Sequence, residues 1–117
     1  MLIDRKEYIE EDGSLGYVET IFKSDNILKT LYFPKINLLY ISFSRGDTYS
    51  YLNINEDLYK EFEAAESHGK FFYSRIFKKT EYPTIREFGL YENEINEIKS
   101  RIKEVVDDLN EQIEDDE

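Results

Sequence analysis

A strand–turn–strand–helix pattern in the middle of this 117-residue chain constrains its fold most. Residues 38–43 (LLYISF) are mostly apolar and predict a strand, and residues 45–47 (RGD) predict the turn that follows it. Residues 48–52 (TYSYL) alternate, so Tyr49 and Tyr51 should face the same side of a second strand. Two such strands joined by a short turn indicate an antiparallel pair.

A helix is expected next, over residues 55–67. Asn55 is a good N-cap, and Gly69 supplies the expected stop. Apolar side chains recur at i, i+4 and i+7, which is the spacing of one helix face: Leu58, Phe62 and Ala65. This helix should lie on the sheet and cover one of its faces.

Further strand formers precede this pattern. Residues 27–33 (ILKTLYF) predict a strand that Pro34 ends. Residues 17–22 also look like a strand piece, next to a glycine turn, so residues 1–23 form an N-terminal extension that could add a strand or hairpin. Together these segments predict an α+β domain built on an antiparallel meander of three to four strands with a crossing helix.

A family pattern is matched at these positions: Tyr49, Tyr51, Leu58, Tyr59, Phe62, Ala65, Ser67, Gly69, Phe71, Phe72 and Ile76. Through them, residues 24–82 resemble the KTSC domain, a module at the C-terminus of some lysyl-tRNA synthetases that also occurs alone in bacterial and phage proteins. The resemblance implies strands at 27–33 and 38–43. The family often has a basic residue where Ser50 stands, and it usually has an asparagine where Tyr73 stands. RNA binding has been suggested for the family, but the resemblance implies no particular activity.

Residues 83–117 predict a long acidic C-terminal helix and tail. Apolar residues spaced alternately by four and three form a heptad seam: Tyr91, Ile95, Ile98, Ile102, Val105 and Leu109. The β-branched residues in this seam favour higher-order assembly or docking over a parallel dimer. The seam could pack on its own sheet, or it could contact another chain, including a second copy in a homo-oligomer.

The formal charge of −11 is concentrated at the C-terminus. Eight carboxylates and no Lys or Arg follow Lys103, which leaves a charge of −3 for residues 1–103. Such a balance repels phosphate backbones at long range. The segment could be a solubilising tail, or it could contact a partner with a basic surface. The candidate contact residues are Glu104, Asp107, Asp108 and Glu111.

Residues 68–80, here called the basic segment, carry no acidic residue. Cations interleaved with rings are what a nucleotide or single-stranded RNA would require, but the rings could equally be core while the cations reach solvent. Tyr49 and Tyr51 have the same two interpretations, a stacking platform or core under the helix. The candidate binding residues are Tyr49, Tyr51, Lys70, Tyr73, Arg75, Lys78 and Lys79.

No motif in the sequence indicates catalysis. The chain has no cysteine and a single histidine, His68, which we expect beside a helix C-terminus. We therefore expect no metal, no cofactor and no enzyme activity. The sequence contains neither an apolar run long enough to cross a membrane nor a signal-peptide pattern, so we expect a cytoplasmic protein.

The favoured function is a non-enzymatic binding protein. In the first hypothesis it is a protein–protein interaction or inhibitor module, of bacterial or phage origin, that acts through its acidic C-terminal helix. In the alternative, it binds RNA or a nucleotide through the basic segment. The acidic balance favours the first hypothesis, and the resemblance favours the second.

Overall fold

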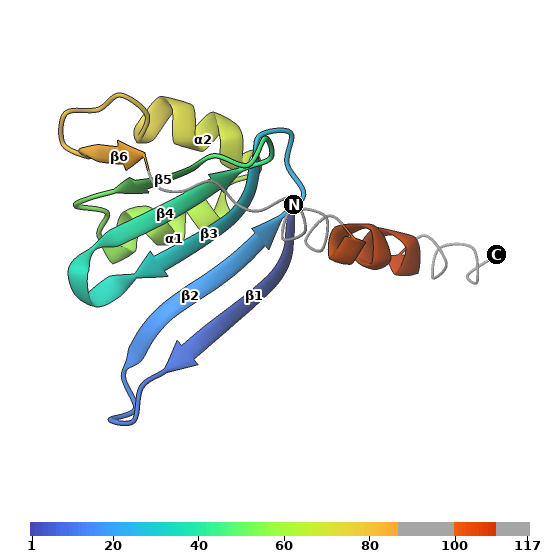
Figure 1. The fold of residues 1–117 in the computed structure, drawn as a ribbon, viewed down its shortest axis with the longest axis horizontal. Helices are drawn as coiled ribbons and strands as arrows, with labels where there is room; N and C mark the ends of the chain where they lie inside the picture. The colour runs from blue at the N-terminus through green and yellow to red at the C-terminus, as the bar shows by residue number, and fades with distance from the viewer. Residues whose placement is uncertain (87–99, 110–117) are drawn as a thin grey trace.

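A computed structural model describes residues 1–86 and 100–109 of the chain. Six antiparallel strands form one sheet in chain order, and two α-helices cover one of its faces (Figure 1). The helices are α1 (Glu56–Ala64) and α2 (His68–Arg75), a short 3-10 turn, η1, spans Pro34–Ile36, and residues 100–109 are helical. The strands are β1 (Leu2–Ile9), β2 (Leu15–Phe22), β3 (Ile27–Phe33), β4 (Leu38–Phe43), β5 (Thr48–Tyr51) and β6 (Thr84–Arg86). The predicted α+β class is confirmed.

The prediction of three to four strands is wrong, because the sheet has six. The N-terminal residues form the hairpin β1–β2, in which Tyr8 lies opposite Tyr17, and β6 pairs with β5 at the other edge. In β1, four consecutive charged residues (DRKE) hide the alternation that marks a strand. Charged side chains are common on edge strands, where they discourage pairing with other chains. β6 follows directly on Pro83 and lies within residues 83–117, for which we expected only a helix and tail.

The strand boundaries follow from local sequence. β3 and β4 begin and end where the apolar runs predict. Gly13 and Gly46 lie in the β1–β2 and β4–β5 turns with φ of 85° and 104°, a conformation that residues with a Cβ rarely adopt. The turn at residues 45–47 is closed by a 2.8 Å bond from the Gly46 amide to the Phe43 carbonyl.

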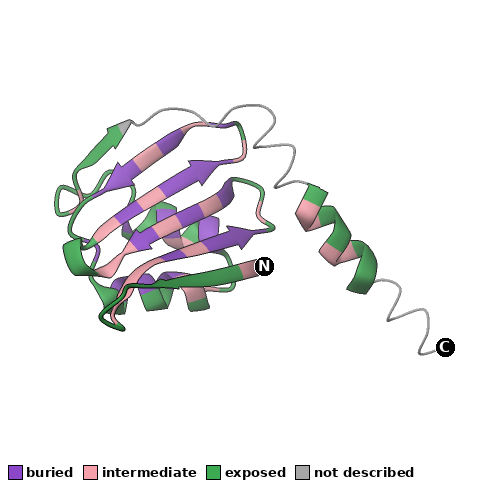
Figure 2. Ribbon diagram, turned by 60° about the horizontal axis from the view of Figure 1, so that its bottom comes forward, coloured by how far each residue is buried: buried purple, intermediate pink, exposed green. Residues whose placement is uncertain are grey.

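The core lies between the sheet and the two helices. Alternate residues of β4, namely Leu39, Ile41 and Phe43, are buried on this side, and Phe62 from α1 and Phe72 from α2 pack over the sheet. Figure 2 shows the alternation of buried and half-buried residues along the central strands. We call the opposite side of the sheet, turned away from α1 and α2, the open face.

The helical region differs from the predicted single helix. Asn55 caps α1 as expected, since its side chain accepts a 2.9 Å bond from the Leu58 amide. However, α1 ends at Ala64, and Ser67 caps a new helix by accepting a bond from the Lys70 amide. Gly69 is therefore no helix stop; it lies buried in the first turn of α2.

None of the helices in the described parts of the chain is long and apolar enough to span a membrane.

Candidate functional site

Tyr49 and Tyr51 point toward the helices, not toward solvent. Tyr51 is 3% exposed, and its ring centroid lies 5.4 Å from that of Phe72. Tyr49 is half-buried, with its ring 5.9 Å from that of Phe43. Burial raises the pKa of Tyr51 to about 12. Tyr51 could stack on a base only by leaving the core, so the structure favours the interpretation of this pair as core.

His68 is not at a helix C-terminus, as we expected, but is the first residue of α2. Its ring is buried between those of Phe22 and Phe62, with centroid distances of 4.4 and 5.5 Å. Burial lowers the pKa of His68, although the hydrogen bond between Nε2 and the Glu63 carbonyl acts in the opposite direction. A protonated histidine would also be unfavourable at the positive end of the helix dipole.

The cations of the basic segment are exposed, but one of them is already paired. The Arg75 guanidinium lies 2.9 Å from the Glu61 carboxylate and 5.1 Å from the centroid of the Phe71 ring. The Lys78 ammonium lies 5.3 Å from the centroid of the Phe77 ring. Both contacts hold a cation over an aromatic ring of its own chain. Arg75 would have to exchange Glu61 for any phosphate that it bound.

Two rings of the basic segment reach the surface. Tyr73 is 48% exposed and Phe77 is 37% exposed, and their ring centroids are 5.1 Å apart. Phe72, in contrast, is buried. The surface of the basic segment therefore includes these two rings together with exposed Arg75 and three exposed lysines, Lys70, Lys78 and Lys79.

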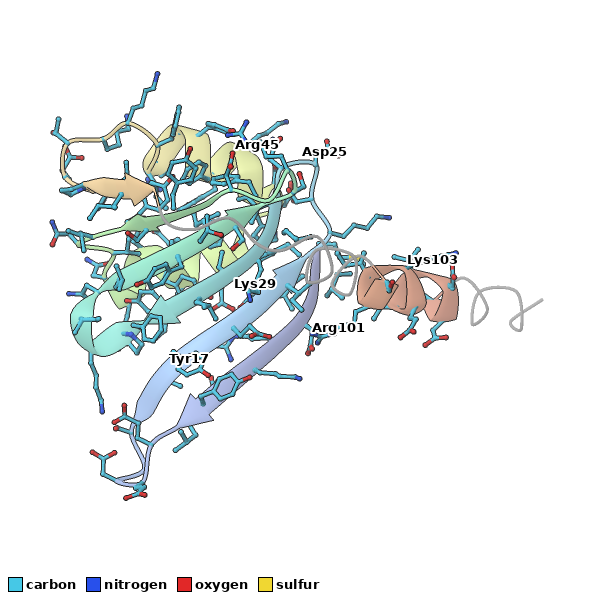
Figure 3. The ribbon with its side chains drawn as sticks, viewed as in Figure 1. Tyr17, Asp25, Lys29, Arg45, Arg101 and Lys103 are labelled. Atoms are coloured by element: carbon cyan, nitrogen blue, oxygen red, sulfur yellow. The ribbon has the colours of Figure 1, made fainter. Side chains whose placement is uncertain are left out.

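The helical residues 100–109 pack against the open face. Ile102 contacts the buried pair formed by Ile21 of β2 and Leu28 of β3. The Arg101 guanidinium forms an ion pair with Asp4 of β1, and Figure 3 shows Arg101 beside β1. At Ile102, the predicted seam thus packs on its own sheet. Its earlier members Tyr91, Ile95 and Ile98 lie outside the described residues.

Three carboxylates on this helix project into solvent: Glu104, Asp107 and Asp108. Within the described parts of the chain, none of them forms an ion pair. Leu109 is 43% exposed, and Val105 is half-buried. We call the carboxylates of Glu104, Asp107 and Asp108 the acidic surface. Glu111 and much of the predicted length of the helix lie outside the described residues.

The open face also carries a row of aromatic rings that sequence reasoning missed. Tyr8 stacks on Tyr17 at 4.1 Å, Tyr17 on Phe33 at 5.2 Å, and Phe33 meets the edge of Tyr40 at 5.8 Å. These residues come from β1, β2, β3 and β4, so they meet only when the strands pair in the observed register. The apolar alternation of β2 and β3 was the available signal, but it did not reveal which rings would become neighbours.

Comparison with known proteins places the central part of the fold in a family. The sequence profile of the KTSC domain matches residues 23–82, which contain β3 to α2. The crystal structure of a KTSC domain protein from Yersinia pestis is similar, with a TM-score of 0.56, 30% identity, and coverage of 60% of this chain and 96% of that chain. Comparison with curated proteins gave no match. The chain belongs to the KTSC domain family.

Proposed function

We propose that this chain is a non-enzymatic protein-binding module that uses the acidic surface of its C-terminal helix to bind, and so to block, a partner with a basic surface. The observation that carries the proposal is the way in which this helix is held. Ile102 and Arg101 attach it to the sheet, while the acidic surface faces solvent. A helix held in this way presents its carboxylates at a constant position for a partner to meet.

The charge distribution supports the same proposal. The residues after Lys103 carry eight carboxylates and no base, and three of those carboxylates form the acidic surface. A concentrated charge of one sign accelerates encounter with a partner of opposite sign and makes association dependent on salt. Leu109, which is 43% exposed beside Asp108, adds apolar area that a partner could bury.

The test compares two variants that lose the same charge. In the first, the acidic surface is neutralised by Glu104→Gln, Asp107→Asn and Asp108→Asn. In the control, three exposed carboxylates elsewhere are neutralised by Glu11→Gln, Glu66→Gln and Glu81→Gln. In affinity capture from a bacterial lysate, the control should retain the partner and the first variant should lose it. Equal retention by both variants would contradict the proposal.

A second candidate function is RNA or nucleotide binding by the basic segment. The observation that favours it is the exposed pair Tyr73 and Phe77, which lies among exposed lysines. Aromatic stacking contributes about 1–3 kcal/mol per base in single-strand binding proteins. Lys70→Glu with Lys78→Glu should then abolish binding of a fluorescent single-stranded RNA. The control variant, Lys6→Glu with Lys60→Glu, should bind the RNA as tightly as the unmodified chain does. Equal binding by the two variants would exclude this candidate.

A further inference from the structure

A cleft lies beside the first turn of α2. It is a cleft of about 700 Å³ between the β2–β3 connection and the start of α2. Residues 23–26 line one wall and residues 66–70 the other, with Tyr73, Ser74 and Met1 at the margins. This volume is typical of a site for a small molecule. We call it the α2 cleft.

The first turn of α2 brings unused hydrogen-bond donors to this cleft. Ser67 accepts a bond from the Lys70 amide, but among the described residues nothing accepts from the amides of His68 and Gly69. Free amides at a helix N-terminus, together with the helix dipole, favour an anion. A helix N-terminus alone does not define a site, because every helix has one.

One ring nitrogen of His68 is buried without a hydrogen-bond partner among the described residues. His68 is 4% exposed and lines the α2 cleft. Its Nε2 lies 3.1 Å from the Glu63 carbonyl, an acceptor, so Nε2 carries the proton of the neutral ring. Nδ1 is then an acceptor, and it has no hydrogen-bond partner among the described residues. A buried acceptor without a donor is destabilising, so a ligand that donates a hydrogen bond to Nδ1 would gain free energy from the contact.

The side chains around the cleft carry both signs of charge. Lys23 and Lys70 provide ammonium groups from the two walls, and Asp25 and Glu66 provide carboxylates. A ligand that suits this surface must accept hydrogen bonds from the amides and lysines and also donate one to Nδ1. A phosphate group that retains one proton meets both requirements.

We propose that the α2 cleft binds the phosphate group of a small phosphate monoester. The amides of His68 and Gly69 donate to its oxygens, with Lys23 and Lys70 balancing its charge. Its remaining O–H donates to Nδ1 of His68, which has less than 1 Å² of exposed surface and must turn toward the cleft to accept this bond. No covalent bond changes, and the proton stays shared between the phosphate oxygen and the ring.

This arrangement couples binding to the uptake of a proton. The second pKa of a phosphate monoester is about 6, so the proton needed by Nδ1 becomes more available as the pH falls from 8 to 6. The charged groups that face His68 are the Glu63 carboxylate of α1 and the amino group of Met1, which act in opposite directions on its pKa. Asp25 and Lys23 on the β2–β3 wall also line the cleft with it. Phosphate should therefore bind more tightly at pH 6 than at pH 8.

The test uses His68 as its own reporter, since it is the only histidine in the chain. Its imidazole NMR signals are followed while inorganic phosphate is added to the full chain at pH 6.5. Inorganic sulfate at equal ionic strength is the control, because it has a similar shape but no proton to donate at this pH. Phosphate should shift the His68 signals in a saturable way and raise the pKa of His68, and sulfate should have a much weaker effect. An equal response to both anions, or none to phosphate, would overturn the proposal.

Variants then locate the site. Lys70→Gln should weaken phosphate binding by about three- to tenfold, the effect of losing one charge-assisted contact. Lys79→Gln, which removes an exposed lysine outside the cleft, should leave the affinity unchanged. Equal weakening by the two variants would mean that phosphate responds to net charge and not to the cleft, and would contradict the proposal.

Two further ligands distinguish the sources of the phosphate. Ribose 5-phosphate and adenosine monophosphate share the phosphate group, but only the second has a ring that could stack on Tyr73, which is 48% exposed at the margin of the cleft. Tighter binding of the nucleotide that disappears in Tyr73→Ala would identify a nucleotide site. Equal binding of both ligands would identify a site for the phosphate and sugar. The proposal is independent of the acidic surface, so the failure of either leaves the other standing.

Discussion

Tyr51 distinguishes most clearly between a ring that holds the core together and a ring that serves a ligand. Tyr51 is 3% exposed and packs on Phe72. Tyr51→Ala leaves a cavity between β5 and α2, and removal of a buried aromatic ring typically lowers the free energy of unfolding by about 3–5 kcal/mol. A domain of this size unfolds with about 5–15 kcal/mol, so this single change should remove a large part of the stability.

A second substitution separates the ring from its hydroxyl. The Tyr51 hydroxyl shares a hydrogen bond with Thr84 of β6, so Tyr51→Phe should lower the free energy of unfolding by only about 0.5–1.5 kcal/mol. Tyr73→Ala, at a ring that is 48% exposed, should change it by about 0.5 kcal/mol or less. Urea unfolding followed by far-UV circular dichroism measures all three, with an unchanged m-value as the check for two-state behaviour. A loss below about 1 kcal/mol for Tyr51→Ala would refute the assignment to the core.

Three further results are expected. The free energy of unfolding should fall as the pH drops below about 6.5, by at most about 1.4 kcal/mol per pH unit, because the pKa of His68 is lower in the folded chain, so the unfolded chain binds a proton first. In urea titrations, His68→Gln should reduce this dependence of stability on pH. The same dependence in the variant would exclude His68 as its cause. Tyr59→Phe should cost about 0.5–1.5 kcal/mol in thermal unfolding, because its buried hydroxyl bonds to Thr20 and Thr30; full stability in the variant would show that these bonds add nothing. Ile102→Asp should release the C-terminal helix from the open face and increase hydrogen exchange at residues 100–109. Identical exchange in the variant and the unmodified chain would contradict this expectation.

The central strands were predictable because each follows from its own residues. The apolar runs of β3 and β4, the glycine turn at 45–47 and the Asn55 cap are local signals, and all four occur as expected. The edges of the sheet were less predictable. β1 has charged residues at its centre, and β6 is three residues long, so neither shows the sequence pattern of a strand. Both become strands because a neighbouring strand pairs with them.

The helix boundary at Ser67 shows why a single residue can mislead. Gly69 is a common helix stop, so the sequence favoured one helix that ended there. Ser67 is an equally good start, and its side chain caps α2. This change moved His68 from the end of one helix to the beginning of another, which reversed its expected relation to the helix dipole.

The candidate sites depend on contacts that are distant in sequence. The Arg75–Glu61 ion pair, the attachment of Ile102 to Ile21, and the α2 cleft each join segments that only the folded chain brings together. Residue types and spacing could nominate the cations and carboxylates. They could not show which of these were already paired within the chain.

Affinity capture of the tagged, unmodified chain from a bacterial lysate shows whether a basic protein or RNA binds to it. Parallel samples are treated with nuclease or left untreated, and both protein and nucleic acid are measured in the eluate. We expect a stoichiometric basic protein that survives nuclease treatment and is released as the salt concentration rises, because screening weakens contacts with the acidic surface. Recovery of RNA that disappears with nuclease, without a stoichiometric protein, would contradict the account.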